Sequence, residues 1–255
     1  MLAGEFVLNN QPFKPAILIP VYNHGTAIRQ TLMGVLSYQL PVLLVDDGSD
    51  TNCRQILINL TKEFSNTVTL LRLEKNAGKG AAVKAGFKQL LKMGYSHALQ
   101  VDADGQHNLD DIPSFIEAGK AHPNNIICGI PEYDESVPKG RYYSRYLTHI
   151  WVWINSLSFE IKDSMCGFRL YPLSPISRLL EQANCGNRMD FDPEIMVRWL
   201  WQNGGINNIP THVHYPPDGV SHFNICQDNA LISWMHTRLF FGMLIRLPKI
   251  LWRRL

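Results

Sequence analysis

Short apolar segments alternate with amphipathic segments along the first half of the chain. Apolar runs of strand length occupy 14–23, 41–45 and 68–73, and stretches with helical spacing follow them at 26–38, 51–64 and 78–93. A fourth apolar run opens the segment HALQVDADGQH at 97–107. Strands that alternate with helices of this length predict an α/β fold, a parallel sheet covered by helices on both faces.

The second half of the chain is less regular. We predict a strand at 125–130, a loop rich in acids and prolines at 131–140, and an aromatic helix at 141–159. The segment DSMCGFRLY lies within 161–171, a helix starts within 188–201, and an outer strand covers 206–215 before the loop PPDGVSHF. The uncharged run 146–159 is too short to span a bilayer, which needs about 20 residues.

Polar residues stand just after the predicted strands. Tyr22 follows the first strand, Asp46 and Asp47 the second, Asn76 the third and Asp102 the fourth. Open α/β sheets bind ligands outside the carboxyl ends of their strands, so these residues predict a binding site there. A simpler alternative for Asp47 is that it caps the next helix.

Asp102 and Asp104 are spaced for metal binding. Residues two apart on an extended chain point to the same side, so both carboxylates could face one cation. Mg²⁺ and Mn²⁺ prefer oxygen ligands and often bind through one or two carboxylates together with substrate phosphates. The pair therefore indicates a metal held against a nucleotide diphosphate. The alternative is an Asp-rich turn at Gly105 that closes the strand.

The segment EKNAGKGAAVKAG at 74–86 has the glycines and lysines of a phosphate loop. It lacks the GxxxxGK[ST] spacing, and the chain has no GxGxxG motif. Nucleotide binding must then depend on carboxylates and metal, with Lys79 as a candidate phosphate contact. Alternatively, the two glycines only start a helix.

Composition narrows the class of protein. Apolar residues make up 45% of the chain and charged residues 18%, which fits a globular protein. The five cysteines are widely spaced, with no CxxC pair, which favours buried thiols in a reducing, cytoplasmic setting over disulfides or zinc. The N-terminus has an early acid and no long apolar core, so we do not expect a signal peptide.

The last 27 residues are strongly basic. Segment 229–255 holds five Lys and Arg residues and no acid, whereas the chain as a whole has a net charge of +2. On an ideal helix, four of the five fall within an arc of roughly 80°, with aromatic and leucine residues over much of the rest. These four are Arg238, Arg246, Lys249 and Arg253.

This pattern predicts a helix in a membrane interface, kinked or divided at Pro248. We therefore divide the chain into a catalytic domain, 1–224, and a basic amphipathic tail, 225–255, with an anionic membrane surface as its partner. The alternative is a helix packed on the domain with solvated basic residues.

Four motifs carry a resemblance to a known family. In this order, VDDGS, NAGKGAA, DADGQH and CGFRLY resemble family 2 glycosyltransferases of the GT-A fold, in the branch of dolichyl- and polyprenyl-phosphate sugar transferases. The resemblance extends from about residue 16 to 223. It implies that Asp102 and Asp104 bind the metal, with Gln106 as a further ligand. It also implies a nucleotide site formed by Pro20, Tyr22, Asn23, Asp46 and Asp47.

The acceptor decides which groups catalyse the transfer. An inverting transfer is one displacement at the anomeric carbon, with the metal stabilising the departing diphosphate. A hydroxyl acceptor needs a carboxylate base, and Asp163 is our first candidate, ahead of Asp192 and Glu194. A phosphate acceptor needs cations instead, for which Arg169 is the candidate. Alternatively, Asp192 and Glu194 are helix-terminal charges and Arg169 braces the sheet.

Three histidines follow these acids. His222 could contact the metal or the diphosphate, as a late histidine does in some GT-A enzymes, or it is simply solvated. His212 and His214 have the spacing of neighbours on one strand face, and without an evident third ligand we interpret them as surface residues.

We therefore expect a metal-dependent, inverting hexosyltransferase that uses Mg²⁺ or Mn²⁺ and a nucleotide-diphosphate sugar. The predicted acceptor is a lipid, polyprenyl phosphate or another, and the predicted location is peripheral on the cytoplasmic face of the cell membrane. No nucleic-acid partner is expected. Two alternatives stay open: a sugar nucleotidyltransferase, and a non-catalytic, membrane-docked protein that binds nucleotide sugars.

Overall fold

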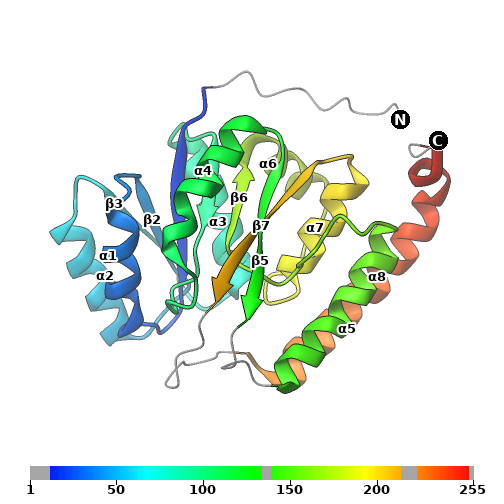
Figure 1. Cartoon of the computed structure of the whole chain (residues 1–255). Coiled ribbons are helices and arrows are strands. Elements are labelled where there is room, and N and C mark those ends of the chain that lie inside the picture. Colours follow the sequence, from blue (N-terminus) through cyan, green and yellow to red (C-terminus); the bar gives the residue numbers. More distant parts are fainter. Residues whose placement is uncertain (1–11, 134–138, 214–222, 253–255) are drawn as a thin grey trace.

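A seven-stranded sheet forms the centre of the molecule in the computed structural model, which describes residues 12–133, 139–213 and 223–252 (Figure 1). The strand order is β3-β2-β1-β4-β6-β5-β7. The strands are β1 Pro15–Val21, β2 Val42–Asp46, β3 Val68–Arg72, β4 His97–Gln100, β5 Ile126–Tyr133, β6 Arg169–Pro172 and β7 Ile206–Val213.

Most neighbouring strands are parallel, which confirms the predicted α/β sheet. β1 pairs in parallel with β2 and β4, β2 with β3, and β5 with β7. The exception, which the sequence pattern did not indicate, is β6, antiparallel to both β4 and β5. Because of this reversal, Arg169 at the start of β6 pairs with Gln100 at the end of β4. Arg169 thus reaches the rim where the parallel strands end.

Helices cover both faces of the sheet. Side chains of β1 alternate, so Ile17 and Ile19 join one apolar cluster and Leu18 joins the other. The first cluster is covered by α1 (Ala27–Leu36), α2 (Thr51–Glu63) and α4 (Ile112–Ala121). The second is covered by α3 (Lys79–Lys92), α6 (Leu173–Gln182) and α7 (Phe191–Trp201). Beyond α7 lie α5 (Lys139–Ser156) and α8 (Ile225–Trp252), side by side (Figure 1).

The second half departs from the predicted elements in three places. Helices α4 and α6 were not predicted, and the predicted loop at 131–140 is wrong at both ends, because β5 continues to Tyr133 and α5 begins at Lys139. Pro131 lies opposite Thr211 of β7. The pairing between β5 and β6 covers Ile127 and Cys128 only, so Pro131 lies where the strand has one paired side and tolerates a residue without an N–H.

Helix α8 packs on the domain through one face. It runs as one helix through Pro248, so this residue does not divide it, and the predicted kink stays a prediction. Its inner face, including Ile232, Leu239 and Ile250, belongs to the same core as α3 and α7. The boundary at residue 224 remains a prediction. Among the helices of the described residues, we find none both long and apolar enough to cross a membrane.

Two of the predicted basic residues of α8 face the domain. Arg238 NH2 lies 3.3 Å from Glu194 Oε2, and the Arg246 guanidinium lies 4.8 Å from the centre of the Trp201 ring. This side of the helix therefore corresponds to the packed alternative. Side chains of the outer face are largely apolar, as considered further below.

Candidate functional site

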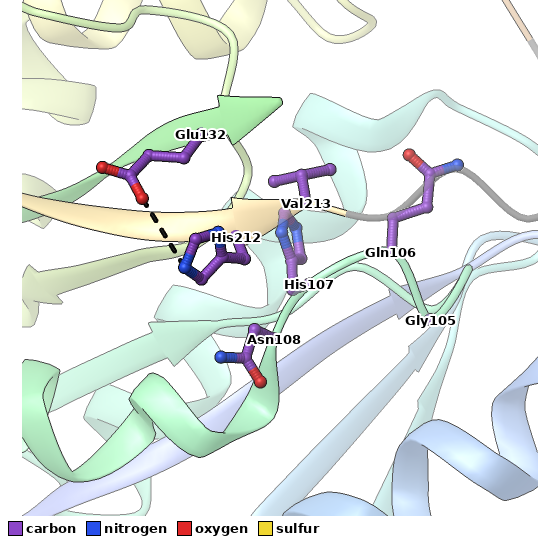
Figure 2. A pocket seen from close by; sticks show the side chains of 7 residues that line it. All are labelled: Gly105, Gln106, His107, Asn108, Glu132, His212 and Val213. Carbon is purple, nitrogen blue, oxygen red and sulfur yellow. Dashed lines mark ion pairs between the residues drawn. The ribbon is translucent and has the colours of Figure 1, made fainter. Parts of the chain in front are cut away.

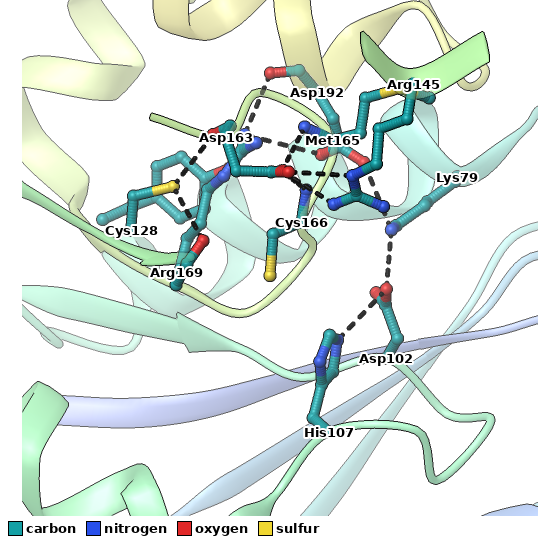
Figure 3. Close-up of polar contacts among 12 residues, drawn as sticks. Lys79, Asp102, His107, Cys128, Arg145, Asp163, Met165, Cys166, Arg169 and Asp192 are labelled. Atoms are coloured by element: carbon teal, nitrogen blue, oxygen red, sulfur yellow. Dashed lines mark hydrogen bonds and ion pairs between the residues drawn. The ribbon is translucent and has the colours of Figure 1, made fainter. Parts of the chain in front are cut away.

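A chain of alternating charges lies at the rim where β4 ends (Figure 3). Lys79, the first residue of α3, places its Nζ 2.9 Å from Asp102 Oδ2 and 3.2 Å from Asp192 Oδ2. Asp192 comes from the first turn of α7. Gly78 permits this approach, because its φ of 99° suits glycine and a Cβ there would strike the backbone of Asn187. The site thus joins three elements that are distant in sequence.

The charges in this chain stabilise one another. Burial alone would lower the pKa of Lys79, but the carboxylates of Asp102 and Asp192 hold it above its usual value. Burial would likewise raise the pKa of Asp102, yet Lys79 and His107 hold it well below the usual range. At neutral pH the lysine is therefore charged and Asp102 is a carboxylate.

Asp102 and Asp104 lie in a turn, because β4 already ends at Gln100. The expectation that an extended chain presents both acids is thus wrong, although the two remain neighbours in one short loop. The Asp104 Oδ1 accepts a hydrogen bond of 3.1 Å from the backbone N–H of Gln106, and Gly105 has a φ of 74°.

These groups fit a hard divalent cation that takes only part of its ligands from the protein. Both carboxylates are partly exposed, and each offers oxygen atoms of the kind that Mg²⁺ and Mn²⁺ bind. Within the described residues, no group of three or more His, Cys, Asp and Glu side chains could hold a metal ion. A cation here would need further ligands, such as diphosphate oxygens. Of the other two predicted ligands, Gln106 lies two residues after Asp104, and His222 lies outside the described residues.

A polar pocket adjoins the acids (Figure 2). It has a volume of about 400 Å³ and is lined by Gly105, Gln106, His107, Asn108, Glu132, His212 and Val213. His107 joins the pocket to the charged chain, since its Nε2 lies 3.4 Å from Asp102 Oδ2. Its ring stacks on Phe168, with centroids 5.2 Å apart. His212, which we interpreted as a surface residue, is 77% exposed and lies 3.6 Å from Glu132.

The predicted nucleotide-binding acids Asp46 and Asp47 brace loops in this structure. Asp46 is buried, pairs with Arg72 and accepts a hydrogen bond from the Ser49 N–H. Asp47 accepts hydrogen bonds of 2.8 and 2.9 Å from the backbone of Ala77 and Gly78, just before α3. Burial raises the pKa of Asp47 despite these bonds. Asp47 thus fixes the start of the helix that carries Lys79.

The other predicted nucleotide contacts lie beside these loops. Pro20 is a buried residue of β1, paired in register with Val45. Tyr22 follows the strand and is half-buried. Asn23 has a positive φ of 53°, donates its backbone N–H to Ser49 Oγ and accepts a hydrogen bond from the Asp50 N–H. The ends of β1 and β2 are therefore linked at one rim, as predicted, and a base-binding role stays a prediction.

Asp163 is engaged by donors on both oxygens. Arg145 of α5 binds it through Nε at 2.8 Å and NH2 at 2.7 Å, and the backbone N–H groups of Met165 and Cys166 add bonds of 2.8 and 2.6 Å. Burial would raise the pKa of Asp163, but Arg145 and these N–H groups lower it. Its role as a base stays a prediction, and these contacts suit a carboxylate that positions Arg145 (Figure 3).

Arg169 is buried inside the rim. Its NH1 donates to the Asp192 carbonyl oxygen at 2.9 Å and to the Tyr171 hydroxyl at 3.2 Å, and it lies 3.9 Å from Asp192 Oδ1. The bracing alternative therefore describes its observed contacts. Arg169 holds the first turn of α7, and with it the carboxylate that binds Lys79.

Glu194 points away from this site. Its Oε1 accepts bonds from Arg198 at 2.9 and 2.7 Å, and its Oε2 accepts one from the Gly186 N–H at 2.8 Å. Arg238 of α8 completes the shell. Asp163 and Asp192 therefore lie in the neighbourhood of Asp102, whereas Glu194 connects α7 to α8.

Sequence reasoning missed two residues of the site. His107 and Arg145 were not singled out, although both contact predicted site residues. His107 closes the DADGQH motif, so its place in that motif was a usable signal. Arg145 offered none, because only the folded chain brings α5 against the loop of Asp163.

Relatives with known names resemble most of this chain. A dolichyl-phosphate beta-glucosyltransferase of Dictyostelium discoideum is 28% identical over 203 residues, which are 71% of this chain and 60% of the relative. An undecaprenyl-phosphate 4-deoxy-4-formamido-L-arabinose transferase of Pseudomonas fluorescens is 33% identical over 184 residues, 70% of this chain and 51% of the relative. The chain thus spans about half to three fifths of the length of these two relatives.

A solved structure supports the fold, and a family model identifies the family. Glucosyl-3-phosphoglycerate synthase from Mycobacterium tuberculosis, solved with Mn²⁺, uridine diphosphate and phosphoglyceric acid, has a TM-score of 0.61 at 12% identity, over 91% of this chain and 77% of that one. This likeness confirms the expected GT-A fold. The model described as glycosyl transferase family 2 matches residues 16–183. The chain belongs to glycosyl transferase family 2.

Proposed function

We propose that this protein is a metal-dependent, inverting glycosyltransferase. It moves a hexose from a nucleotide-diphosphate sugar to a lipid-type acceptor at a membrane surface. The observation that carries this proposal is the rim cluster, in which Lys79 bridges Asp102 and Asp192 while Asp104 lies in the same short loop as Asp102. The names of the relatives, which act on dolichyl and undecaprenyl phosphates, support the acceptor class.

The donor diphosphate would bind at the Asp102–Asp104 loop. A divalent cation held by these two carboxylates would stabilise the charge that develops on the departing diphosphate. The Mn²⁺ and uridine diphosphate in the M. tuberculosis synthase support a donor and metal of this kind. Lys79 is a fixed positive charge beside the same position, and it stays protonated because two carboxylates flank it.

The donor sugar fits the adjoining pocket. Hydroxyl groups of a hexose need both donors and acceptors, which the amides of Gln106 and Asn108 and the carboxylate of Glu132 supply. His107 lies between this pocket and Asp102, so it would contact the sugar near the bond that breaks.

The contacts of the predicted bases favour an acceptor that is already ionised. Asp163 is a weak proton acceptor, because Arg145 and two backbone N–H groups lower its pKa. A phosphate acceptor carries its own negative charge near pH 7 and needs cations to position it. Arg145 of α5 and Lys79 of α3 supply such charges. The role we assign to Asp163 is therefore to hold Arg145.

Location follows from the acceptor. A lipid phosphate remains in the bilayer while its head group meets water, so the enzyme must act at the membrane surface. We place it peripherally on the cytoplasmic face, where nucleotide sugars are available, with α8 against anionic lipid.

The test of the proposal is a transfer assay with the purified chain. The protein is incubated with Mn²⁺ and a panel of nucleotide sugars, with and without a short polyprenyl phosphate in detergent, and the released nucleoside diphosphate is measured. We expect release that depends on both the metal and the lipid. Release that continues at the same rate after chelation would contradict the metal assignment.

Asp104→Asn is the decisive variant. Its Oδ1 contact with the Gln106 N–H can be kept by the amide, so the fold should survive while the metal ligand is lost. We expect turnover to fall by about a hundredfold or more. Glu117→Gln in α4 is the matched control, because Glu117 is 78% exposed and remote from the rim. Equal turnover in the two variants would refute the metal site.

A further inference from the structure

Helices α5 and α8 share an exposed apolar surface. On α5 it comprises Tyr146, Leu147, Ile150, Trp151 and Ile154; on α8 it comprises Trp234, Phe241, Leu244, Ile245, Leu251 and Trp252. We call these residues the α5–α8 apolar face. The two helices lie side by side along one flank of the molecule (Figure 1). Their contact is direct, since Trp151 packs against Phe240 and His236.

The spacing on each helix makes the surface continuous. On α5 the exposed residues recur at intervals of three and four, which places them on one side of the helix. On α8 the exposed Phe241, Ile245 and Trp252 fall within about 20° of Trp234 on an ideal helix. Leu239 and Ile250 point to the opposite side and are buried in the core. The fold is therefore stabilised by the inner sides of these helices.

The extent of this exposure is unusual for a surface that stays in water. Ile245 is 79% exposed and Trp252 is 81% exposed, so these bulky side chains gain little from the fold itself. Contiguous apolar surface of this kind marks a site of interaction with a partner or a membrane. Tryptophan and tyrosine, four of which contribute to this face, are the residues that favour the boundary between water and lipid.

The charges on α5 and α8 favour an anionic bilayer over a second copy of the chain as the partner. Neither segment 139–159 nor segment 229–255 contains an Asp or Glu, whereas both contain Lys and Arg. On the helical wheel Lys249 lies about 60° from Trp234, at the border of the apolar stripe, and it is exposed. A second copy would bring like charges together across a symmetric contact. An anionic bilayer instead pairs apolar side chains with acyl chains and the bordering lysine with head groups.

We propose that α5 and α8 together form a docking surface for an anionic lipid bilayer. Its apolar side chains enter the interfacial layer and provide most of the affinity, and Lys249 at its border provides a smaller, salt-sensitive part. This differs from a basic tail acting alone, because α5 belongs to the domain and because Arg238 and Arg246 of α8 contact residues of α7. The physiological reason for docking, access to a lipid acceptor, rests on the proposed function.

The docking surface is connected to the site through one helix. Arg145 begins the same stretch of α5 that carries Leu147 and Trp151, and it binds Asp163 beside the charged rim. A bilayer on the α5–α8 apolar face would therefore lie next to the side of the site that carries Arg145. A lipid head group could reach the site without the acyl chain leaving the membrane.

The experiment compares matched variants for binding to vesicles. The full chain is sedimented with vesicles of phosphatidylcholine, with or without phosphatidylglycerol, at low and moderate salt. The α5 variant is Leu147→Gln with Ile154→Gln, and the α8 variant is Ile245→Gln with Trp252→Gln. The control is Met33→Gln with Met93→Gln, which removes exposed apolar side chains elsewhere. We expect each test variant to weaken binding by at least about tenfold and the control to bind normally.

Several outcomes would overturn the proposal. An α5 variant that binds vesicles like the unaltered chain would restrict docking to α8. Loss of binding with added salt in all samples alike would make the contact electrostatic. A chain that is dimeric in solution and becomes monomeric in the test variants would identify a second copy as the occupant.

Transfer activity separates this proposal from the function. With a short, detergent-solubilised acceptor, the test variants should turn over at the rate of the unaltered chain, because their substitutions lie outside the site. Vesicle binding without any transfer would leave the docking surface standing and refute the proposed function. If transfer is observed but the test variants bind vesicles normally, the proposed function would stand and the docking surface would be refuted.

Discussion

Each charged residue at the rim is held by contacts with oppositely charged or polar neighbours, so most substitutions there would remove a contact. Lys79 is positioned by two carboxylates, Asp192 by Arg169, and Asp102 by Lys79 and His107. Removing one member of such a set leaves its partner with a charge that no opposite charge balances. This costs about 3–5 kcal/mol of stability when the pair is buried. A loss of activity in these variants could therefore come from a loss of folded protein or from a loss of a contact in the reaction. Substitutions that displace a carboxylate without removing it are more informative.

Gly167→Ala is such a substitution. The loop that precedes β6 brings Gly167 against the Asp102 carboxylate, and an added methyl group would overlap both carboxylate oxygens. We expect the Asp102 side chain to move away from Lys79 and turnover to fall by about a hundredfold, since a shift near 1 Å at a reacting centre costs this much. Turnover and the midpoint of thermal unfolding should be measured on the same sample.

The stability loss in Gly167→Ala should be smaller than the effect on the reaction. An added methyl group in a filled space costs about 1–3 kcal/mol of stability, and movement of the surrounding loop can relieve part of the overlap. A stably folded variant with unaltered turnover would show that the position of Asp102 is not critical.

At the scale of elements, the parallel part of the fold follows from local patterns. Apolar runs and helical spacing placed β1 to β3 and the helices that follow them to within a few residues, because each crossover is a local unit. The antiparallel β6 could not be placed in the same way, since its direction depends on pairing with β4 and β5. Asp46, Asp47 and Asp102 were predictable from their positions after strands. Arg72 and Arg145 were not, because their ion pairs form only in the folded chain.

The contact between α5 and α8 contains a histidine that predicts a pH dependence. His236 is buried, its Nδ1 accepts a hydrogen bond of 3.1 Å from the Asn155 amide, and burial lowers its pKa from 6.5 to about 4. The unfolded chain takes up a proton near pH 6.5, whereas the folded chain resists it until about pH 4. Stability is therefore lost as the pH falls through this window, by about 2 kcal/mol at pH 5 from this group.

Replacing the histidine tests this assignment. His236→Gln should flatten the fall in the free energy of unfolding between pH 7 and pH 5, as measured by urea titration. His212→Gln is the control, because His212 is 77% exposed and lies outside the contact between α5 and α8. Other buried histidines such as His97 and His149 add their own slope, so the difference between the two variants is the quantity to compare. Equal slopes would contradict the role of His236.

At the scale of the whole molecule, the acids that follow several strands are brought to one rim, and contacts within the chain hold the surrounding loops. Asp46 and Asp47 fix the loops after β2 and before α3, while Arg169 fixes α7. Such a site pays little ordering cost on binding, so the affinity for a donor should appear directly as added stability.

Nucleoside diphosphate and Mn²⁺ together should therefore raise the unfolding temperature more than the sum of their separate effects. Ligand at a hundred times its Kd adds about 2.7 kcal/mol, which for a chain of this size corresponds to roughly 5–10 °C. Differential scanning fluorimetry over several nucleoside diphosphates would also identify the base. The corresponding nucleosides, which lack the diphosphate, should leave the temperature unaltered.

Asp104→Asn separates the metal from the nucleotide in this measurement. The variant should keep the shift caused by nucleotide alone, because the loops after β1 and β2 are intact, and lose the increment that Mn²⁺ adds. If every nucleoside diphosphate left the unaltered chain at its original unfolding temperature, with and without Mn²⁺, the rim would not be a donor site. If the variant instead retained the metal increment, the cation would bind elsewhere than at Asp104.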